Sequence, residues 1–144
     1  MASIEIRALG PQIGAEVINW SAEGELSQAL LQQIGEALVQ HQALVIHAPE
    51  LTPEQHLAIA HYFGEPEVHT FFPNLGEGYE QITIIDSSLG DRADMWHHDE
   101  SFLPSPPILT MTQAKILPPT GGDTCFISMT SAYDTLSPAM KKYL

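Results

Sequence analysis

Cationic side chains are scarce in this sequence of 144 residues. Five Lys and Arg stand against 18 Asp and Glu, which gives a formal net charge of -13. Such a charge repels a phosphate backbone, and no cluster of Lys or Arg is present that could neutralise one. We therefore expect no nucleic acid among the partners of this protein.

Cysteine and long apolar runs are scarce as well. The single cysteine, Cys125, cannot form a disulfide within the chain. The opening MASIEIRALG lacks the basic start and apolar run of a secretory signal, and no apolar stretch approaches the length needed to cross a bilayer. These absences predict a cytoplasmic protein without a membrane partner. The length predicts one domain that can bury a core.

Structural signals in the first third of the chain are local. Polar and apolar residues alternate over 3–7 and again over 15–18, on either side of the Gly10-Pro11 turn, which predicts a hairpin. Apolar residues at helical spacing predict an amphipathic helix over 26–41. The next apolar residues predict a buried strand over 43–46.

A second helix is predicted over 53–63 because its two ends carry recognised signals. Thr52 can serve as N-cap, with proline at the first helical position and Gln55 three residues after the cap, and Gly64 supplies a stop.

The second half of the chain reads mainly as strand. Strands are predicted over 81–86, 109–115 and 123–128, with a turn over 118–122 before the last of them. Gly121 and Gly122 in that turn are expected to adopt positive φ. Helix signals follow at Ser131 and at Ser137-Pro138.

The string Trp96-His97-His98-Asp99-Glu100 carries the most chemistry. In an extended segment the first and third side chains of His-x-Asp lie on the same face, so the His97 imidazole and the Asp99 carboxylate converge. Two histidines and one carboxylate on one face of Fe(II) form the facial triad of oxygenases. The alternative is that these are ordinary polar residues of a loop.

Several stretches together carry a resemblance to a known family. In chain order they are Leu9-Gly10-Pro11-x-Ile13-Gly14-Ala15, His41-Gln42 with Leu44-Val45-Ile46, Leu51-Thr52-Pro53 with Phe63-Gly64-Glu65, Trp96-His97-x-Asp99-x-x-Phe102, Pro106-Pro107, and Leu117-Pro118-x-Thr120-Gly121-Gly122-Asp123-Thr124. In order and spacing this set resembles the taurine dioxygenase (TauD/TfdA) family of Fe(II)- and 2-oxoglutarate-dependent dioxygenases. The match runs through nearly the whole chain.

The resemblance implies roles for individual residues. His97 and Asp99 match the family's iron ligands, and Thr124 matches a threonine that contacts 2-oxoglutarate, for which a hydroxyl donor is suited. His98 is expected to point away from the metal.

Two further residues are implied in substrate binding. His69 matches a histidine that contacts the organic substrate, and Phe72 stands where a tyrosine near the substrate is expected. Ala93 replaces an expected polar residue, so taurine itself is not the expected substrate. The alternative for His69 is a plain loop histidine.

The implied fold is α+β and mainly β, a double-stranded β-helix (jelly roll) core with flanking helices. Residues 1–144 then form the amino-terminal portion of a single dioxygenase domain. In the family, the second histidine ligand and the arginine that binds the far carboxylate of 2-oxoglutarate come from a later region, so both are expected beyond residue 144. No Lys or Arg of this sequence occupies the position of the family's arginine. The 144-residue chain alone is therefore expected to be inactive.

The implied function is hydroxylation of a small organic substrate, sulfonate-like or otherwise anionic, with O2 and 2-oxoglutarate consumed and succinate and CO2 released. Fe(II) is the implied metal, and association into a homo-oligomer is left open. Two alternatives remain at this point. One is a non-catalytic binding or scaffold domain of the same fold, and the other is a zinc-dependent hydrolytic site.

Overall fold

The computed structural model describes residues 4–20, 26–90 and 93–144. The chain divides into two compact units. The first unit consists of Met1–Pro49 together with Ile116–Leu144, and the second of Glu50–Lys115.

The first unit contains a three-stranded sheet of order β1-β2-β3. Strands β1 (Glu5–Ala8) and β2 (Ala15–Ile18) pair antiparallel, which confirms the predicted hairpin, although Ser3 lies outside the described residues. Strand β3 (Leu44–Ile46) pairs parallel to β2. The middle strand therefore has a partner on each side.

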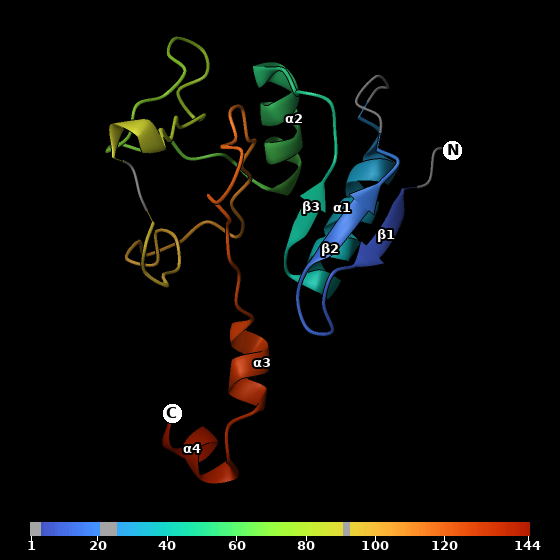
Figure 1. The fold of residues 1–144 in the computed structure, drawn as a ribbon, viewed down its shortest axis with the longest axis vertical. Coiled ribbons are helices and arrows are strands. Elements are labelled where there is room, and N and C mark those ends of the chain that lie inside the picture. Colours follow the sequence, from blue (N-terminus) through green and yellow to red (C-terminus); the bar gives the residue numbers. More distant parts are fainter. Residues whose placement is uncertain (1–3, 21–25, 91–92) are drawn as a thin grey trace. The chain divides into compact units, whose positions relative to one another are not determined.

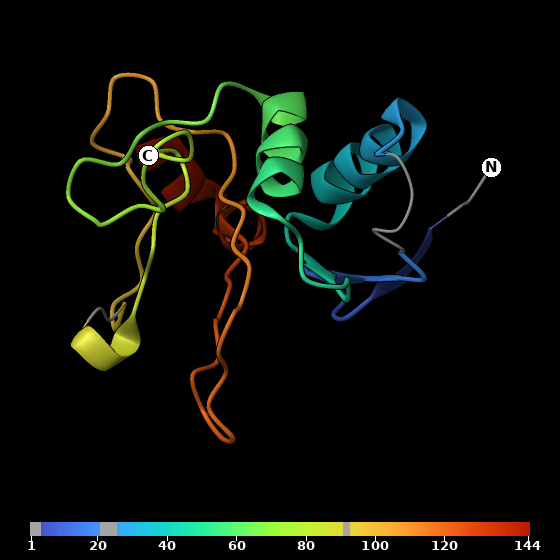
Figure 2. The ribbon, with the colours of Figure 1, turned by 90° about the horizontal axis from the view of Figure 1, so that it is seen from above.

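Helix α1 (Gln28–His41) connects β2 to β3 and covers one face of the sheet (Figures 1 and 2). Its buried residues are Leu31, Ile34 and Ala37, at the spacing that places side chains on one helix face. Ala15 and Val17 are buried at alternate positions of β2. These apolar groups form the core of the first unit.

The first unit also contains two short helices, α3 (Met129–Asp134) and α4 (Pro138–Tyr143). Ser137 caps α4 as the sequence predicted. The cap of α3 is Ser128, whose hydroxyl accepts from the N–H of Ser131, so the expected helix start at Ser131 is wrong by one turn. The Ser128 hydroxyl also donates to the Gln42 side chain.

The second unit is built around α2 (Pro53–Phe63), whose predicted bounds are confirmed. Both hydrogen bonds of the Thr52 and Gln55 capping box are present, and Ile59 is buried. The rest of this unit is loop, with a 3-10 turn (η1, Ser87–Leu89) and one isolated bridge between Asn74 and Thr83.

The strands predicted over 81–86, 109–115 and 123–128 are wrong for the structure as described. None of these segments is assigned as a strand, and helices contain more of the described residues than strands do. A strand needs a neighbour to receive its backbone hydrogen bonds. Within the described ranges, 81–86 pairs only through the single bridge at Thr83, and no strand pairing is found for 109–115 or 123–128. Their apolar side chains are accordingly exposed, as at Ile85, Phe126 and Ile127.

Across residues 4–20, 26–90 and 93–144, no helix combines the length and apolar character that crossing a bilayer requires.

Candidate functional site

The segment that contains His97 and Asp99 is an irregular stretch of the second unit that ends in a turn. The two side chains point toward each other, with Nε2 of His97 3.1 Å from Oδ1 of Asp99. Each side chain is about half exposed. The predicted convergence is therefore present without a regular strand.

A backbone carbonyl fixes the orientation of the His97 ring. Nδ1 lies 2.8 Å from the carbonyl oxygen of Met95, and because a carbonyl can only accept, Nδ1 is the donor. This leaves Nε2 as the nitrogen directed at Asp99. The pKa of His97 is raised, first by the hydrogen bond with Met95 and then by the negative charge of Asp99.

A second residue holds the carboxylate of Asp99 from the other side. The hydroxyl of Thr110 donates to Oδ2 of Asp99 at 3.0 Å, while Oδ1 faces His97. Hydrogen bonds of this kind orient the first ligands of a metal site. Sequence reasoning did not identify Thr110, because no local pattern relates it to Asp99.

The pair fits the donor chemistry of a non-haem iron site. An imidazole nitrogen and a carboxylate oxygen are the ligand types of the facial triad, and two ligands about 2.1 Å from one metal at a right angle lie about 3 Å apart. The 3.1 Å separation matches that spacing. Within the described ranges no group of three His, Cys, Asp or Glu that could hold a metal is found.

His98 has a local partner of its own. Its Nδ1 lies 2.9 Å from the backbone oxygen of Asp99 and so donates to it.

His69 lies in a cluster with aromatic side chains in the second unit. Its ring is 4.9 Å from the ring of Phe72 and 5.7 Å from that of Phe71, measured between centroids. Its Nε2 is 3.4 Å from Oε1 of Glu100, the residue that follows Asp99. The predicted neighbours His69 and Phe72 are thus brought together, and Glu100 is a member that sequence reasoning missed.

Thr124 belongs to the first unit and is exposed. The turn before it contains Gly121 and Gly122, each with φ of 75°, which confirms the expected positive φ. The contact of Thr124 with 2-oxoglutarate stays a prediction.

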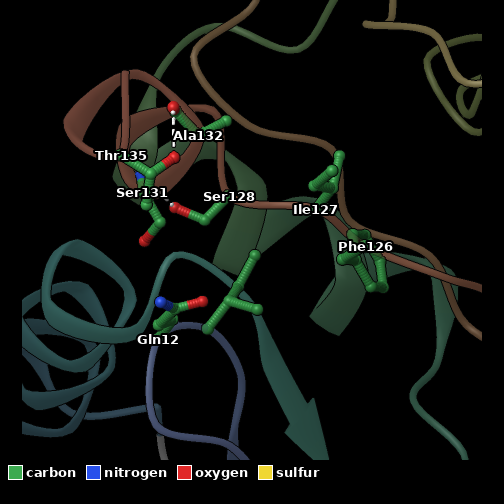
Figure 3. A pocket seen from close by; sticks show the side chains of 8 residues that line it. Gln12, Phe126, Ile127, Ser128, Ser131, Ala132 and Thr135 are labelled. Carbon is green, nitrogen blue, oxygen red and sulfur yellow. Dashed lines mark hydrogen bonds between the residues drawn. The ribbon is translucent and has the colours of Figure 1, made fainter. Parts of the chain in front are cut away.

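The first unit has a hollow of about 310 Å³ between the β1–β2 loop and the start of α3 (Figure 3). Its lining is Gln12, Ile13, Phe126, Ile127, Ser128, Ser131, Ala132 and Thr135. No residue of this lining can serve as a general acid, a general base or a strong metal ligand. The hollow therefore offers apolar surface and hydroxyl groups, and it includes none of the predicted site residues.

Comparisons with known proteins agree on one family. The family model described as "Taurine catabolism dioxygenase TauD, TfdA family" matches residues 5–144. The chain is similar to an alkylsulfatase of Acinetobacter baylyi, with 31% identity over 97% of this chain and 44% of that protein. It is also similar to an alpha-ketoglutarate-dependent sulfate ester dioxygenase of Pseudomonas putida, with 26% identity over 96% of this chain and 46% of that protein.

Among solved structures, the chain is similar to one from Burkholderia xenovorans assigned as an alpha-ketoglutarate-dependent taurine dioxygenase. The TM-score is 0.80 at 27% identity, over 98% of this chain and 52% of the other. The chain thus spans about half the length of these relatives.

Proposed function

Because the chain belongs to the TauD/TfdA dioxygenase family, we propose that the protein is an Fe(II)- and 2-oxoglutarate-dependent dioxygenase. It hydroxylates a small organic substrate and releases succinate and CO2. The observation that carries this proposal is the convergence of His97 Nε2 and Asp99 Oδ1 at 3.1 Å. The Met95 carbonyl orients the His97 ring, and the Thr110 hydroxyl orients the Asp99 carboxylate.

In this proposal His97 and Asp99 are two of the protein ligands of Fe(II). Iron and 2-oxoglutarate, when bound, supply the chemistry that activates O2. Met95 fixes which ring nitrogen of His97 faces the metal, and Thr110 fixes the plane of the Asp99 carboxylate. The negative charge of Asp99 offsets part of the charge of the cation.

Thr124 is the residue proposed to bind the cosubstrate. We propose that the Thr124 hydroxyl donates a hydrogen bond to a carboxylate oxygen of 2-oxoglutarate. The glycines at positions 121 and 122 support this role, because their backbone conformation sets where the chain continues into Thr124. The third protein ligand and the arginine partner of the far carboxylate are proposed to lie outside residues 1–144.

The organic substrate is proposed to bind near His69 and Phe72. The sulfate ester dioxygenase among the relatives supports a sulfate-ester-like or sulfonate-like substrate class. Taurine is disfavoured because Phe72 lacks the hydroxyl expected at that position, and Ala93 lacks a polar group.

The complete protein is proposed to have a double-stranded β-helix core. The similar structure from Burkholderia xenovorans supports this fold. The exposed apolar residues of the segments predicted as strands, such as Ile85, Phe126 and Ile127, also support it, because strand pairing in the complete protein would cover them. Residues 1–144 are the amino-terminal portion of that single domain.

The test is iron-dependent release of succinate from 2-oxoglutarate by the complete protein. His97→Ala and Asp99→Ala should abolish release and weaken Fe(II) binding, while His98→Ala should retain most of both. Zinc-dependent hydrolysis of the substrate without succinate release would instead favour a hydrolytic zinc site. Absence of release from the complete protein would favour a non-catalytic domain.

The same assay on the 144-residue chain alone should give no turnover, because two protein ligands do not complete the triad. Robust turnover by this chain would contradict the proposal that a further ligand lies outside it.

A further inference from the structure

Both ring nitrogens of His69 are engaged, and their partners identify its tautomer. The backbone N–H of Phe71 donates to Nδ1 at 3.2 Å, so Nδ1 carries a lone pair. The hydrogen of the neutral ring is therefore on Nε2, which faces Oε1 of Glu100 at 3.4 Å. The N–H side of the His69 ring thus faces the Glu100 carboxylate.

The position of Glu100 is enforced by an uncommon backbone conformation. Its φ is +48°, in the left-handed region that side chains other than Gly, Asn and Asp seldom adopt. The carbonyl of Glu100 accepts from the N–H of Leu103 at 3.0 Å, which closes the turn. Backbone strain of this kind tends to occur where a side chain must be aimed at a particular place.

The pair is more covered than the residues around it. The side chains of His69 and Glu100 are 23% and 22% exposed, whereas Phe71 is 81% exposed. A neutral imidazole beside a carboxylate leaves one net negative charge, and the nearby Phe71 and Phe72 rings add no polar group to offset it. Water screens such a charge less when the group is partly covered.

We propose that Glu100 is a specificity-determining residue of the organic substrate site. Its carboxylate faces Nε2 of His69 and places a negative charge there, so the substrate presents an N–H, O–H or ammonium donor to this end of the site. The anionic group of a sulfonate or sulfate ester is then held elsewhere. This inference rests on the proposed function and narrows its substrate class.

Two probes with the same tail and opposite head groups test the proposal on the complete protein. n-Hexylamine and hexyl sulfate are titrated calorimetrically into the protein loaded with Mn(II) and 2-oxoglutarate, so that no turnover intervenes. Glu100→Gln should weaken hexylamine binding and strengthen hexyl sulfate binding, each by about tenfold.

Glu100→Gln is chosen because its amide oxygen can still accept from Nε2-H of His69 while the charge is removed. The matched control is Glu67→Gln, which removes the same charge from an exposed residue two positions before His69 and should change neither affinity. Nitrogen NMR of His69 should report the same tautomer in both variants, which verifies that the cluster is still folded.

An unchanged hexylamine affinity in Glu100→Gln would overturn the inference, and so would equal effects of Glu100→Gln and Glu67→Gln. Failure of the proposed function is a separate result, because it appears as an absence of iron-dependent succinate release. The head-group preference is read from binding and does not depend on that assay.

Discussion

The hydroxyl of Ser128 donates a hydrogen bond of 2.7 Å to Oε1 of Gln42, which lies 86 residues earlier in the chain. Ser128 is buried, and the same oxygen accepts the N–H of Ser131 at the start of α3. Gln42 is the C-cap of α1 with φ of 64°. One hydroxyl therefore joins the end of α1 to the beginning of α3.

Ser128→Ala should lower the free energy of unfolding by about 1 to 3 kcal/mol, since it removes a helix cap and leaves the Gln42 side-chain oxygen without its donor. Urea unfolding followed by circular dichroism measures the change. Ser137→Ala is the matched control, because Ser137 caps α4 in the same way at an exposed position. Ser137→Ala should lower the free energy of unfolding by a smaller amount, about 1 kcal/mol or less. Equal losses would mean that the bond to Gln42 contributes nothing.

Thr110→Val should weaken metal binding about 10-fold to 100-fold in the complete protein, because the Asp99 carboxylate loses the hydroxyl that orients it. Valine keeps the shape of threonine, so the change isolates the hydrogen bond. Titration with Mn(II) measures the affinity. Thr112→Val makes the same change at an exposed residue two positions away and should leave the affinity unaltered. An unchanged affinity in Thr110→Val would remove Thr110 from the site.

Gly122→Ala should destabilise the turn over 118–122 by about 1 to 2 kcal/mol, since φ at this position is +75° and a side chain rarely adopts it. The added methyl would also lie 3.1 Å from Cγ of Pro118. Because Thr124 follows this turn, the KM for 2-oxoglutarate should rise in the complete protein.

Gly64→Ala is the comparison for this substitution. Its φ of 166° is extended backbone that any residue adopts, and the space around it is open. The free energy of unfolding of Gly64→Ala should stay within about 0.5 kcal/mol of that of the unsubstituted chain. A larger loss at Gly64 than at Gly122 would contradict the role of positive φ.

The pKa of His56 is lowered, mainly by burial, against an opposing hydrogen bond with the backbone of Met111. The folded second unit thus favours neutral His56, and the unfolded chain binds more protons at mildly acidic pH. The resulting stability is present above the ordinary histidine pKa of about 6.5 and is lost as the pH falls through the lowered value. Proton NMR titration of His56 and thermal unfolding on both sides of this range measure the effect. His56→Gln should flatten this part of the stability profile, and an unchanged profile would contradict the assignment.

Sequence signals succeeded where the stabilising contacts are close in the chain. The bounds of α2 follow from Thr52, Gln55 and Gly64, which lie within or beside the helix that they delimit. The convergence of His97 and Asp99 was predictable for the same reason, because the two residues lie only two positions apart in the chain.

Sequence signals failed where partners are remote. The segment 109–115 has the composition of a strand, but strand formation depends on a neighbour that no local pattern can supply. The pairing of His69 with Glu100 and that of Thr110 with Asp99 connect separate loops, so neither could be read from spacing. The start of α3 was misplaced because Ser128 and Ser131 are both good caps, and the bond to Gln42 decides between them.

The parallel pairing of β2 with β3 sets an order for folding. The β1–β2 hairpin closes through a short loop and can form within microseconds, whereas β3 can join only after α1 has returned the chain to the same sheet edge. Contacts between residues distant in sequence form late because their loop closure is costly. We therefore expect β3 to be the last strand added to the sheet and its amide hydrogens to exchange with solvent before those that β1 and β2 share.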